Sequence, residues 1–290
     1  MKKLFNKLFI GGDWQVKVFA KNNSQIIKPQ KGYWYGDPFL FSHNDELFLF
    51  VEAFHKKKEL GYIGYLSSND GFNKLSILIE EKFHFSFPNV FAVNDIIYMI
   101  PESGEKNGIF LYKFDAYPNG IALVQKLIDG PFVDTALVEM QNNIGYFITY
   151  NPEEKTLYSL IVDFTTFKAE ITLIKEDPNK IWRPAGNAFK KDSTNYIPFQ
   201  NCSTKYGESI LLREASVKEG NVVIEDTARE IKPVDFDIDR KAKRLHTYNL
   251  INDNCYVIDY MMEGFKLFKS FKMLKRIQRR KKHKKELGHG

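Results

Sequence analysis

The chain has 290 residues, of which 43% are hydrophobic and 15% aromatic, and its formal net charge is +6. This length allows one large domain or two ordinary ones, and no stretch approaches the roughly 20 apolar residues of a membrane-spanning helix. The two cysteines, Cys202 and Cys255, exclude a disulfide framework and lack the spacing of a zinc site, so we expect free thiols in a reducing compartment.

The first ten residues resemble the start of a signal peptide, but Asn6 and Lys7 interrupt the apolar run and Gly11 ends it. This run is too short for the hydrophobic region of a secretory signal. We therefore expect a cytoplasmic protein in which residues 1–32 form an N-terminal segment and a closing strand.

Five segments then share one pattern: a polar or turn residue, a short apolar strand, a turn and a second apolar strand. They cover residues 37–52, 88–102, 134–150, 183–200 and 246–259. A period of about 40–50 residues with several short strands in each unit is typical of a β-propeller. A β-sandwich is the alternative, but it does not explain why the same hairpin recurs. The pattern predicts an all-β protein with one five-bladed propeller domain over residues 33–263.

In a propeller the innermost strand of each blade runs beside the axis, so the residues at its start face one shared mouth. The candidates at these starts are Asp37, Asp134, Arg183 and His246, with His84 shortly before Pro88 in the second repeat. The ends of the following strands add Glu52, Glu102, Gln200, Asn201 and Asp259. Polar groups that converge in an apolar fold predict a binding or active site on the axis.

Several runs resemble the N-terminal domain of plant glucosamine inositolphosphorylceramide transferases. They lie in the right order within about residues 33–260, at 36–41, 84–91, 97–103, 111–112, 133–135, 183–186, 200–207 and 246–247. The resemblance implies a fold similar to the five-bladed propellers of arabinanases, levansucrases and invertases. In the plant proteins, sugar transfer is credited to a separate glycosyltransferase domain that these runs do not include.

The resemblance also implies roles for the acids, because five-bladed glycosidases use carboxylates from different blades. Asp37 matches a base or nucleophile, Asp134 matches a modulator, and Glu102 is the third catalytic candidate. Each has a structural alternative as a turn residue or a partner of backbone amides. The fourth repeat departs from the pattern, because Arg183, Gln200 and Asn201 stand where a hydrolase would need a proton donor.

An arginine at the mouth favours an anionic sugar or sugar-phosphate substrate, since its guanidinium binds phosphate or carboxylate at two points. The alternative is a structural salt bridge from Arg183 to Asp134 or Asp37. The remaining substrate-binding candidates are polar or aromatic side chains near the mouth, each with a packing alternative. They are His84, His246, Glu52, Gln200, Asn201 and Trp34.

No motif demands a cofactor. A divalent cation near His246 is left open by similarity to related propellers. The acidic run at residues 235–239 lacks the glycine and the downstream glutamate of a calcium loop, and a solvated turn explains it more simply.

The last part of the chain, residues 264–290, differs in composition from the rest. Residues 265–290 hold eleven Lys and Arg against one Glu, which leaves the rest of the chain mildly acidic. Apolar residues recur every three or four positions from Leu267 to Ile277, which predicts a basic amphipathic helix. We expect residues 265–285 to contact an anionic membrane surface, with docking on the propeller as the alternative. Nucleic-acid binding is disfavoured because the aromatics lie on the apolar face and the globule is acidic.

Three hypotheses follow. The first is a cytoplasmic, peripherally membrane-associated glycosyltransferase that acts on an activated or lipid-linked sugar in the assembly of surface polysaccharide or glycolipid. The second is a glycoside hydrolase of the five-bladed type. The third is a non-catalytic module that binds glycan and positions a partner glycosyltransferase.

Overall fold

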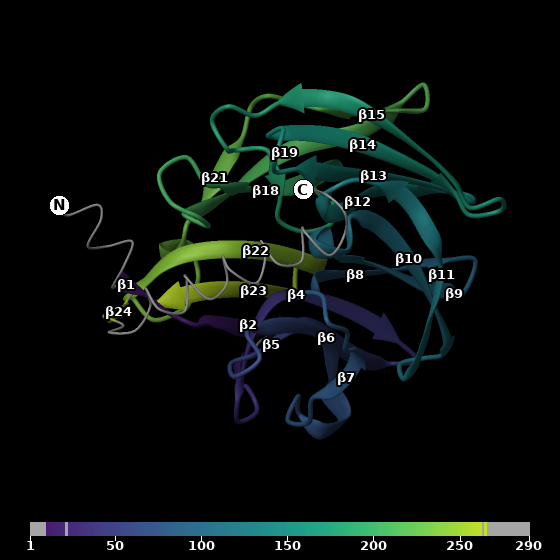
Figure 1. Cartoon of the computed structure of the whole chain (residues 1–290). Coiled ribbons are helices and arrows are strands. Elements are labelled where there is room, and N and C mark those ends of the chain that lie inside the picture. Colours follow the sequence, from purple (N-terminus) through teal and green to yellow (C-terminus); the bar gives the residue numbers. More distant parts are fainter. Residues whose placement is uncertain (1–9, 21–22, 263, 266–290) are drawn as a thin grey trace.

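A computed structural model of the chain describes residues 10–20, 23–262 and 264–265, and it consists of antiparallel sheets arranged around one axis (Figure 1). The innermost strands of neighbouring blades contact one another around the axis, and the last blade returns to the first. Neighbouring blades pack through aromatic side chains such as Phe50, Phe87 and Phe199, all of which are fully buried. The predicted five-bladed propeller is therefore confirmed. The predicted C-terminal helix lies outside the described residues.

The first three blades follow the same simple path from the axis outwards. Blade one comprises β4 (Tyr33–His43), β5 (Glu46–His55), β6 (Leu60–Ser67) and β7 (Ser76–Ile79), with the short 3₁₀ helix η1 (Ser68–Asp70) before β7. Blade two comprises β8 (Ser86–Val93), β9 (Ile96–Glu102), β10 (Gly108–Ala116) and β11 (Gly120–Asp129), with η2 (Gly104–Lys106) before β10. Blade three comprises β12 (Val133–Gln141), β13 (Ile144–Asn151), β14 (Thr156–Asp163) and β15 (Lys168–Glu176).

Blade four is less regular, because both its innermost and its outermost strands are split. It comprises β16 (Arg183–Pro184), β17 (Phe189–Lys191), β18 (Thr194–Asn201), β19 (Ser209–Lys218), β20 (Asn221–Ile224) and β21 (Arg229–Ile231), followed by η3 (Pro233–Asp235). Gly186 lies in the gap between β16 and β17 with a φ of 154°, and a Cβ there would lie 2.3 Å from the Tyr248 carbonyl oxygen. Glycine at this position thus lets blade four approach blade five closely.

Blade five joins the two ends of the propeller sequence. Its inner strands β22 (Ala242–Asn252) and β23 (Cys255–Met262) come late in the chain, and its outer strands β2 (Trp14–Ala20) and β3 (Asn23–Ile27) come early. The pairing of β2 with β23 runs from Trp14↔Met261 to Ala20↔Cys255 and closes the ring by backbone hydrogen bonds. The short strands β1 (Ile10–Gly11) and β24 (Gly264–Phe265) pair beside it. Among the described residues, no helix has the length and apolar character needed to cross a bilayer.

The sequence specifies these hairpins through their turns. Asn44 and Asp45 between β4 and β5, and Asn94 and Asp95 between β8 and β9, all have positive φ. Two successive residues with positive φ form the turn whose twist matches paired strands, and Asn and Asp tolerate it better than most residues. The turn fixes the register, and the register decides which residues reach the mouth.

Three buried or partly buried asparagines link the five blades around the axis. Asn89 of blade two donates to the Thr135 carbonyl of blade three (2.9 Å), and the Asn187 amide of blade four donates to the Asn89 side-chain oxygen (2.8 Å). Asn249 of blade five accepts from the Asn187 backbone N–H (3.0 Å) and donates to the Pro38 carbonyl of blade one (2.8 Å). We call Asn89, Asn187 and Asn249 the asparagine ring. It holds all five inner strands together just beyond the mouth.

Replacing Asn187 tests this ring. Asn187→Ala removes the partner of Asn89 and also leaves the Leu137 N–H without its acceptor (2.7 Å). Each buried polar group left unpaired costs about 1–3 kcal/mol, so we expect a lower free energy of unfolding in denaturant titrations. Asn69→Ala, at an exposed position, is the matched control. Equal stability of the two variants would show that the ring holds nothing together.

Candidate functional site

The inner strands of the first three blades share one backbone feature at the mouth. Asp37, Phe87 and Asp134 occupy equivalent positions with φ of 47°, 46° and 50°, and each lies within a register shift of its strand pair. A left-handed residue other than glycine costs about 1–2 kcal/mol, and such a bulge turns a side chain out of the regular ladder. Because two of the three residues are acids, the bulges direct carboxylates across the axis instead of along their own sheets.

The strand register brings a second set of residues to the same level. Gly36 pairs with Glu52 in blade one and Ser86 with Glu102 in blade two. Arg183 pairs with Gln200 in blade four, and Thr247 with Asp259 in blade five. Each of these four blades therefore presents a polar side chain from its second strand beside the start of its first.

One group of charges lies where blade five meets blade one. His246 Nδ1 lies 2.9 Å from Asp37 Oδ1 and 3.4 Å from Asp259 Oδ2, and all three residues are buried. The Asp37 N–H donates to Asp259 Oδ2 (3.0 Å). On the other side of the imidazole, Nε2 is hydrogen-bonded to the Tyr206 hydroxyl, and Trp14 stacks on the ring with centroids 4.9 Å apart. The imidazole is thus fixed on both edges and on one face.

The surroundings determine the charge of this group. Burial raises the pKa of Asp37, although His246 opposes the shift. Burial alone would lower the pKa of His246, but Tyr206, Asp37 and Asp259 together raise that pKa well above its usual value. The raised pKa of His246 favours an imidazolium beside Asp37 and Asp259, whose positive charge compensates carboxylates that would otherwise be costly to bury.

A second group lies where blades two, three and four meet. Arg183 Nε is paired with Asp134 Oδ2, and its Nη2 lies 3.6 Å from Glu102 Oε2. Gln200 Nε2 donates to the same Asp134 oxygen (3.2 Å) and to the Pro184 carbonyl (2.9 Å). The structure therefore contains the salt bridge from Arg183 to Asp134 that the sequence left as an alternative. Its guanidinium already faces two carboxyl groups, which reduces its capacity for a further anion.

The surroundings of Glu102 shift its pKa upwards. Burial raises its pKa well above the usual value, the Asp134 carboxylate raises it further, and Arg183 only partly opposes both. A raised pKa favours the protonated form of the carboxyl group, and that form can donate a proton or a hydrogen bond. The fourth repeat has no acid at the expected position, and the second repeat provides at the mouth a carboxyl group whose pKa is raised.

Tyr206 connects the two groups, and sequence analysis did not single it out. Its hydroxyl contacts His246, and the Arg183 guanidinium carbon lies 5.5 Å from the centre of its ring. Tyr206 lies between β18 and β19 and is 41% exposed, so it borders the mouth from solvent. Tyr206 lies within the run at 200–207, one of the runs that carry the family resemblance. Trp14 lies outside the repeats and outside these runs, and only the pairing of β2 with β23 brings it to the axis.

His84 and Glu52 form a third pair at the rim. His84 Nε2 lies 3.3 Å from Glu52 Oε1, and the Gly61 N–H donates to His84 Nδ1 (3.0 Å). A Cβ on Gly36 would lie 3.5 Å from Glu52 Oε2 and 3.6 Å from Asp259 Oδ2. Glu52 and Asp259 therefore both lie close to Gly36, and the pair of His84 and Glu52 adjoins the charges around His246.

Two other predicted binding residues lie farther from these charges. Trp34 is half-buried and stacks on Phe54 with centroids 4.6 Å apart, and Phe54 lies 6.1 Å from the His84 ring. The Trp34 ring also lies beside Gly36, where an added Cβ would be 3.0 Å from Trp34 Cζ3, so Trp34 adjoins the rim pair. Asn201 donates to the Ser209 hydroxyl (3.1 Å) and lies 3.4 Å from Glu230 Oε1, so its side chain joins the outer strands of blade four.

Asp37, His246 and Asp259 were also tested as ligands of a cation, since their ligand atoms lie within 4.8 Å of one another. Asp259 already accepts hydrogen bonds from the Asp37 and Thr247 amides and from the Thr247 hydroxyl (3.0, 2.7 and 3.0 Å). A metal-bound histidine must be neutral, whereas the two carboxylates favour the protonated form here. These residues fit an imidazolium better than a metal ion.

The family model described as "Glucosamine inositolphosphorylceramide transferase 1, N-terminal" matches residues 21–256. The chain belongs to this family. It is 29% identical over 226 residues to glucosamine inositolphosphorylceramide transferase 1 of Oryza sativa subsp. indica, an alignment that covers 73% of this chain and 29% of the rice protein. The Arabidopsis thaliana protein of the same name is 28% identical over 295 residues, with 87% and 38% covered. The chain thus spans about a third of these relatives.

Solved structures support the fold of this family member. An exo-β-1,3-galactanase from Phanerochaete chrysosporium superimposes with a TM-score of 0.58 at 9% identity, over 90% of this chain and 65% of that one. A galactanase from Clostridium thermocellum gives 0.54 at 10% identity, over 86% and 62%. At such identities the likeness establishes the propeller architecture and leaves the chemistry to the site.

The protonation of Glu102 can be measured directly. Because its pKa is raised, the protonated form should persist well above the pH at which an exposed glutamate ionises. Difference infrared spectroscopy of the wild-type protein minus Glu102→Gln should show a carboxylic-acid band at pH 7, which disappears only at higher pH. Glu80→Gln is the control, because the hydrogen bond from Lys58 lowers the pKa of Glu80, and it should give carboxylate bands alone. A carboxylate signal for Glu102 at pH 7 would contradict the described electrostatics.

Proposed function

We propose that this protein is a carbohydrate-active enzyme that transfers a sugar at the axial mouth, in the assembly of a cell-surface polysaccharide or glycolipid. The observation that carries the proposal is the group of charged and polar side chains from all five blades that meet there. We call this group the axial cluster. It comprises Asp37, Glu102, Asp134, Arg183, Tyr206, His246 and Asp259.

The cluster offers the two functions that reaction at a glycosidic bond requires. Protonated Glu102 can give its proton to the leaving oxygen as the bond to the sugar breaks. Asp37, held by His246, can accept the proton of the incoming hydroxyl as the new bond forms. Asp134 and Arg183 act on the reaction by setting the charge around Glu102. In transfer the incoming hydroxyl belongs to an acceptor, and in hydrolysis it belongs to water.

The names of the relatives favour transfer over hydrolysis as the proposed reaction, although the chain spans only about a third of those proteins. Hydrolysis is the second candidate, favoured by the glycosidases that share the fold and by the pairing of a protonated with an ionised carboxyl group. The salt bridge between Arg183 and Asp134 makes the sugar ring, more than a phosphate, the part of the substrate bound at the cluster.

We further propose peripheral association with an anionic, cytoplasmic membrane surface. β23 carries Asp259 at the mouth and continues in the same direction to Met262, and β24 follows. The chain therefore leaves the described propeller on the side of the axial cluster. The basic residues at 266–285 would bring anionic lipid to this side, which suits a lipid-linked sugar.

Sugar transfer is tested with the purified chain, a panel of nucleotide-linked and lipid-linked sugars with glycolipid acceptors, and a panel of synthetic glycosides. Glu102→Gln should lower turnover by about 10²–10⁴-fold, the range for loss of a general acid. Asp45→Asn, an exposed turn acid, should leave it unchanged. Release of free sugar without transfer would favour the hydrolase. Glycan binding without turnover would favour a binding module and contradict the proposed reaction.

Membrane association is tested by co-sedimentation with vesicles. Replacing Lys281, Lys282, Lys284 and Lys285 by glutamine removes four charges, each worth about 1 kcal/mol near an anionic surface. We expect the wild-type chain to sediment with vesicles containing phosphatidylserine and the variant to do so far more weakly. Equal sedimentation with neutral phosphatidylcholine vesicles would show that the basic residues do not direct the association.

A further inference from the structure

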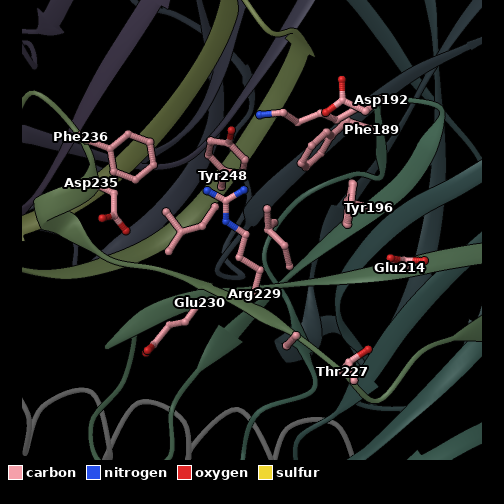
Figure 2. Close-up of a pocket in the computed structure, with 14 residues that line it drawn as sticks. Phe189, Asp192, Tyr196, Glu214, Thr227, Arg229, Glu230, Asp235, Phe236 and Tyr248 are labelled. Carbon is pink, nitrogen blue, oxygen red and sulfur yellow. The ribbon is translucent and has the colours of Figure 1, made fainter.

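A cavity of about 610 Å³ lies between blades four and five (Figure 2). We call it the interblade groove. It exists because the outermost strand of blade four is split: β20 pairs with residues 215–218 of β19, and β21 pairs with residues 210–212. Between them the chain departs from the sheet, and η3 then leads into β22. The groove opens where a continuous outer strand would have closed the blade.

The groove is separate from the axial cluster. Gln200, which binds Asp134 at the axis, pairs with Ile210, whereas the groove residues Tyr196 and Glu214 pair with each other four positions farther along the same two strands. At about 3.3 Å per residue this separates them by roughly 13 Å. A ligand in the groove would therefore leave the axial mouth open.

Aromatic side chains form the walls of the groove. Tyr248 is central, with Phe189 at 5.7 Å and Phe236 at 5.9 Å between ring centroids, and Tyr196 lies 6.2 Å from Phe189. Phe236, Tyr196 and Tyr248 are only partly buried, so their faces and edges remain accessible. Such rings provide apolar surface and hydroxyl groups at one place, and the C–H faces of a sugar ring pack well on surfaces of this kind.

The charged residues of the groove restrict its ligand. Figure 2 shows the Arg229 guanidinium extending into the space below Tyr248. Within the described part of the chain, no ion pair or hydrogen bond is found for the Arg229 side chain. Its N–H groups are therefore available to bind a ligand in the cavity. Two basic and four acidic residues line the groove. The excess of acids disfavours an anionic ligand, and the central arginine disfavours a basic one.

We propose that the interblade groove binds a neutral oligosaccharide, held by stacking on Tyr248 and Tyr196 and by hydrogen bonds from its hydroxyls to Arg229 and the flanking carboxylates. Carboxylates and a guanidinium each bind pairs of neighbouring hydroxyls, and the aromatic walls bind the apolar face of the ring. This site goes beyond the proposed reaction at the axis, because it would retain a glycan chain beside the mouth without acting on it.

The test is a titration of the full chain with β-1,3-galactotriose, arabinohexaose and maltohexaose. Binding is measured by calorimetry and by NMR of the aromatic side chains. Binding should perturb Tyr196 and Tyr248. Arg229→Ala should weaken it by about tenfold or more, as expected for lost hydrogen bonds to a charged group. Arg240→Ala, another exposed arginine, should bind like the wild type. Asp37→Asn should also leave binding in the groove unchanged.

Three outcomes would overturn the proposal. Perturbation confined to the axial cluster and abolished by Asp37→Asn would mean that the axis is where the sugars bind. Absence of binding to every probe at millimolar concentration would exclude a saccharide site. Binding of a synthetic peptide of residues 266–285 to the groove, with no saccharide binding, would make it a docking site for the chain's own basic segment. None of these outcomes depends on turnover, so the proposed reaction is judged separately.

Discussion

The hydrogen bonds of the asparagine ring fix the distances between the inner strands on which the site depends. Apolar contacts between neighbouring sheets have no strong preferred direction, so they fix the relative position of the sheets less sharply than hydrogen bonds do. Amide groups accept and donate along defined lines, and the links through Asn89, Asn187 and Asn249 involve every blade. Because these links fix the spacing of the blades, side chains from different blades can lie close together at the mouth.

The charges at the mouth show what this geometry permits. Asp37, Asp134 and Asp259 are almost fully buried, which would be unfavourable for isolated carboxylates. His246 lies beside two of them and Arg183 beside the third. Arg183 is paired closely with Asp134, so Glu102 has no full positive partner of its own. Protonation of Glu102 would neutralise its charge instead, which agrees with its raised pKa. The shortage of positive charge around Glu102 thus favours the proposed acid.

Sequence periodicity predicted the blades and the mouth because equivalent positions of a repeat occupy equivalent places around an axis. This reasoning predicted Asp37, Asp134, Arg183 and His246 at the starts of inner strands. Asp134 and Arg183 lie at such starts, whereas Asp37 and His246 are the fifth residues of β4 and β22. The reasoning could not choose the partner of Arg183, which depends on side-chain reach across blades. It also treated Asn201 as an equal of Gln200, although adjacent residues of a strand point to opposite faces.

Features outside the repeat were not predictable from it. Trp14 reaches His246 only because the earliest strands complete the last blade. Tyr206 belongs to a connection between strands, where no period applies. The interblade groove arises from an interruption between β20 and β21, which the sequence shows only as a polar stretch. In each case a departure from the repeat adds a residue or a cavity that the regular fold would lack.

The central claim is that acids from different blades share one small volume at the mouth. Carbon-13 NMR titration of the Glu102 side chain, in the wild-type protein and in Asp37→Asn, tests this most directly. Asp37 contributes to the raised pKa of Glu102 through its negative charge, so removing that charge should lower the pKa of Glu102. An unchanged pKa would mean that blades one and two do not present these groups to each other, and the account of the site would be wrong.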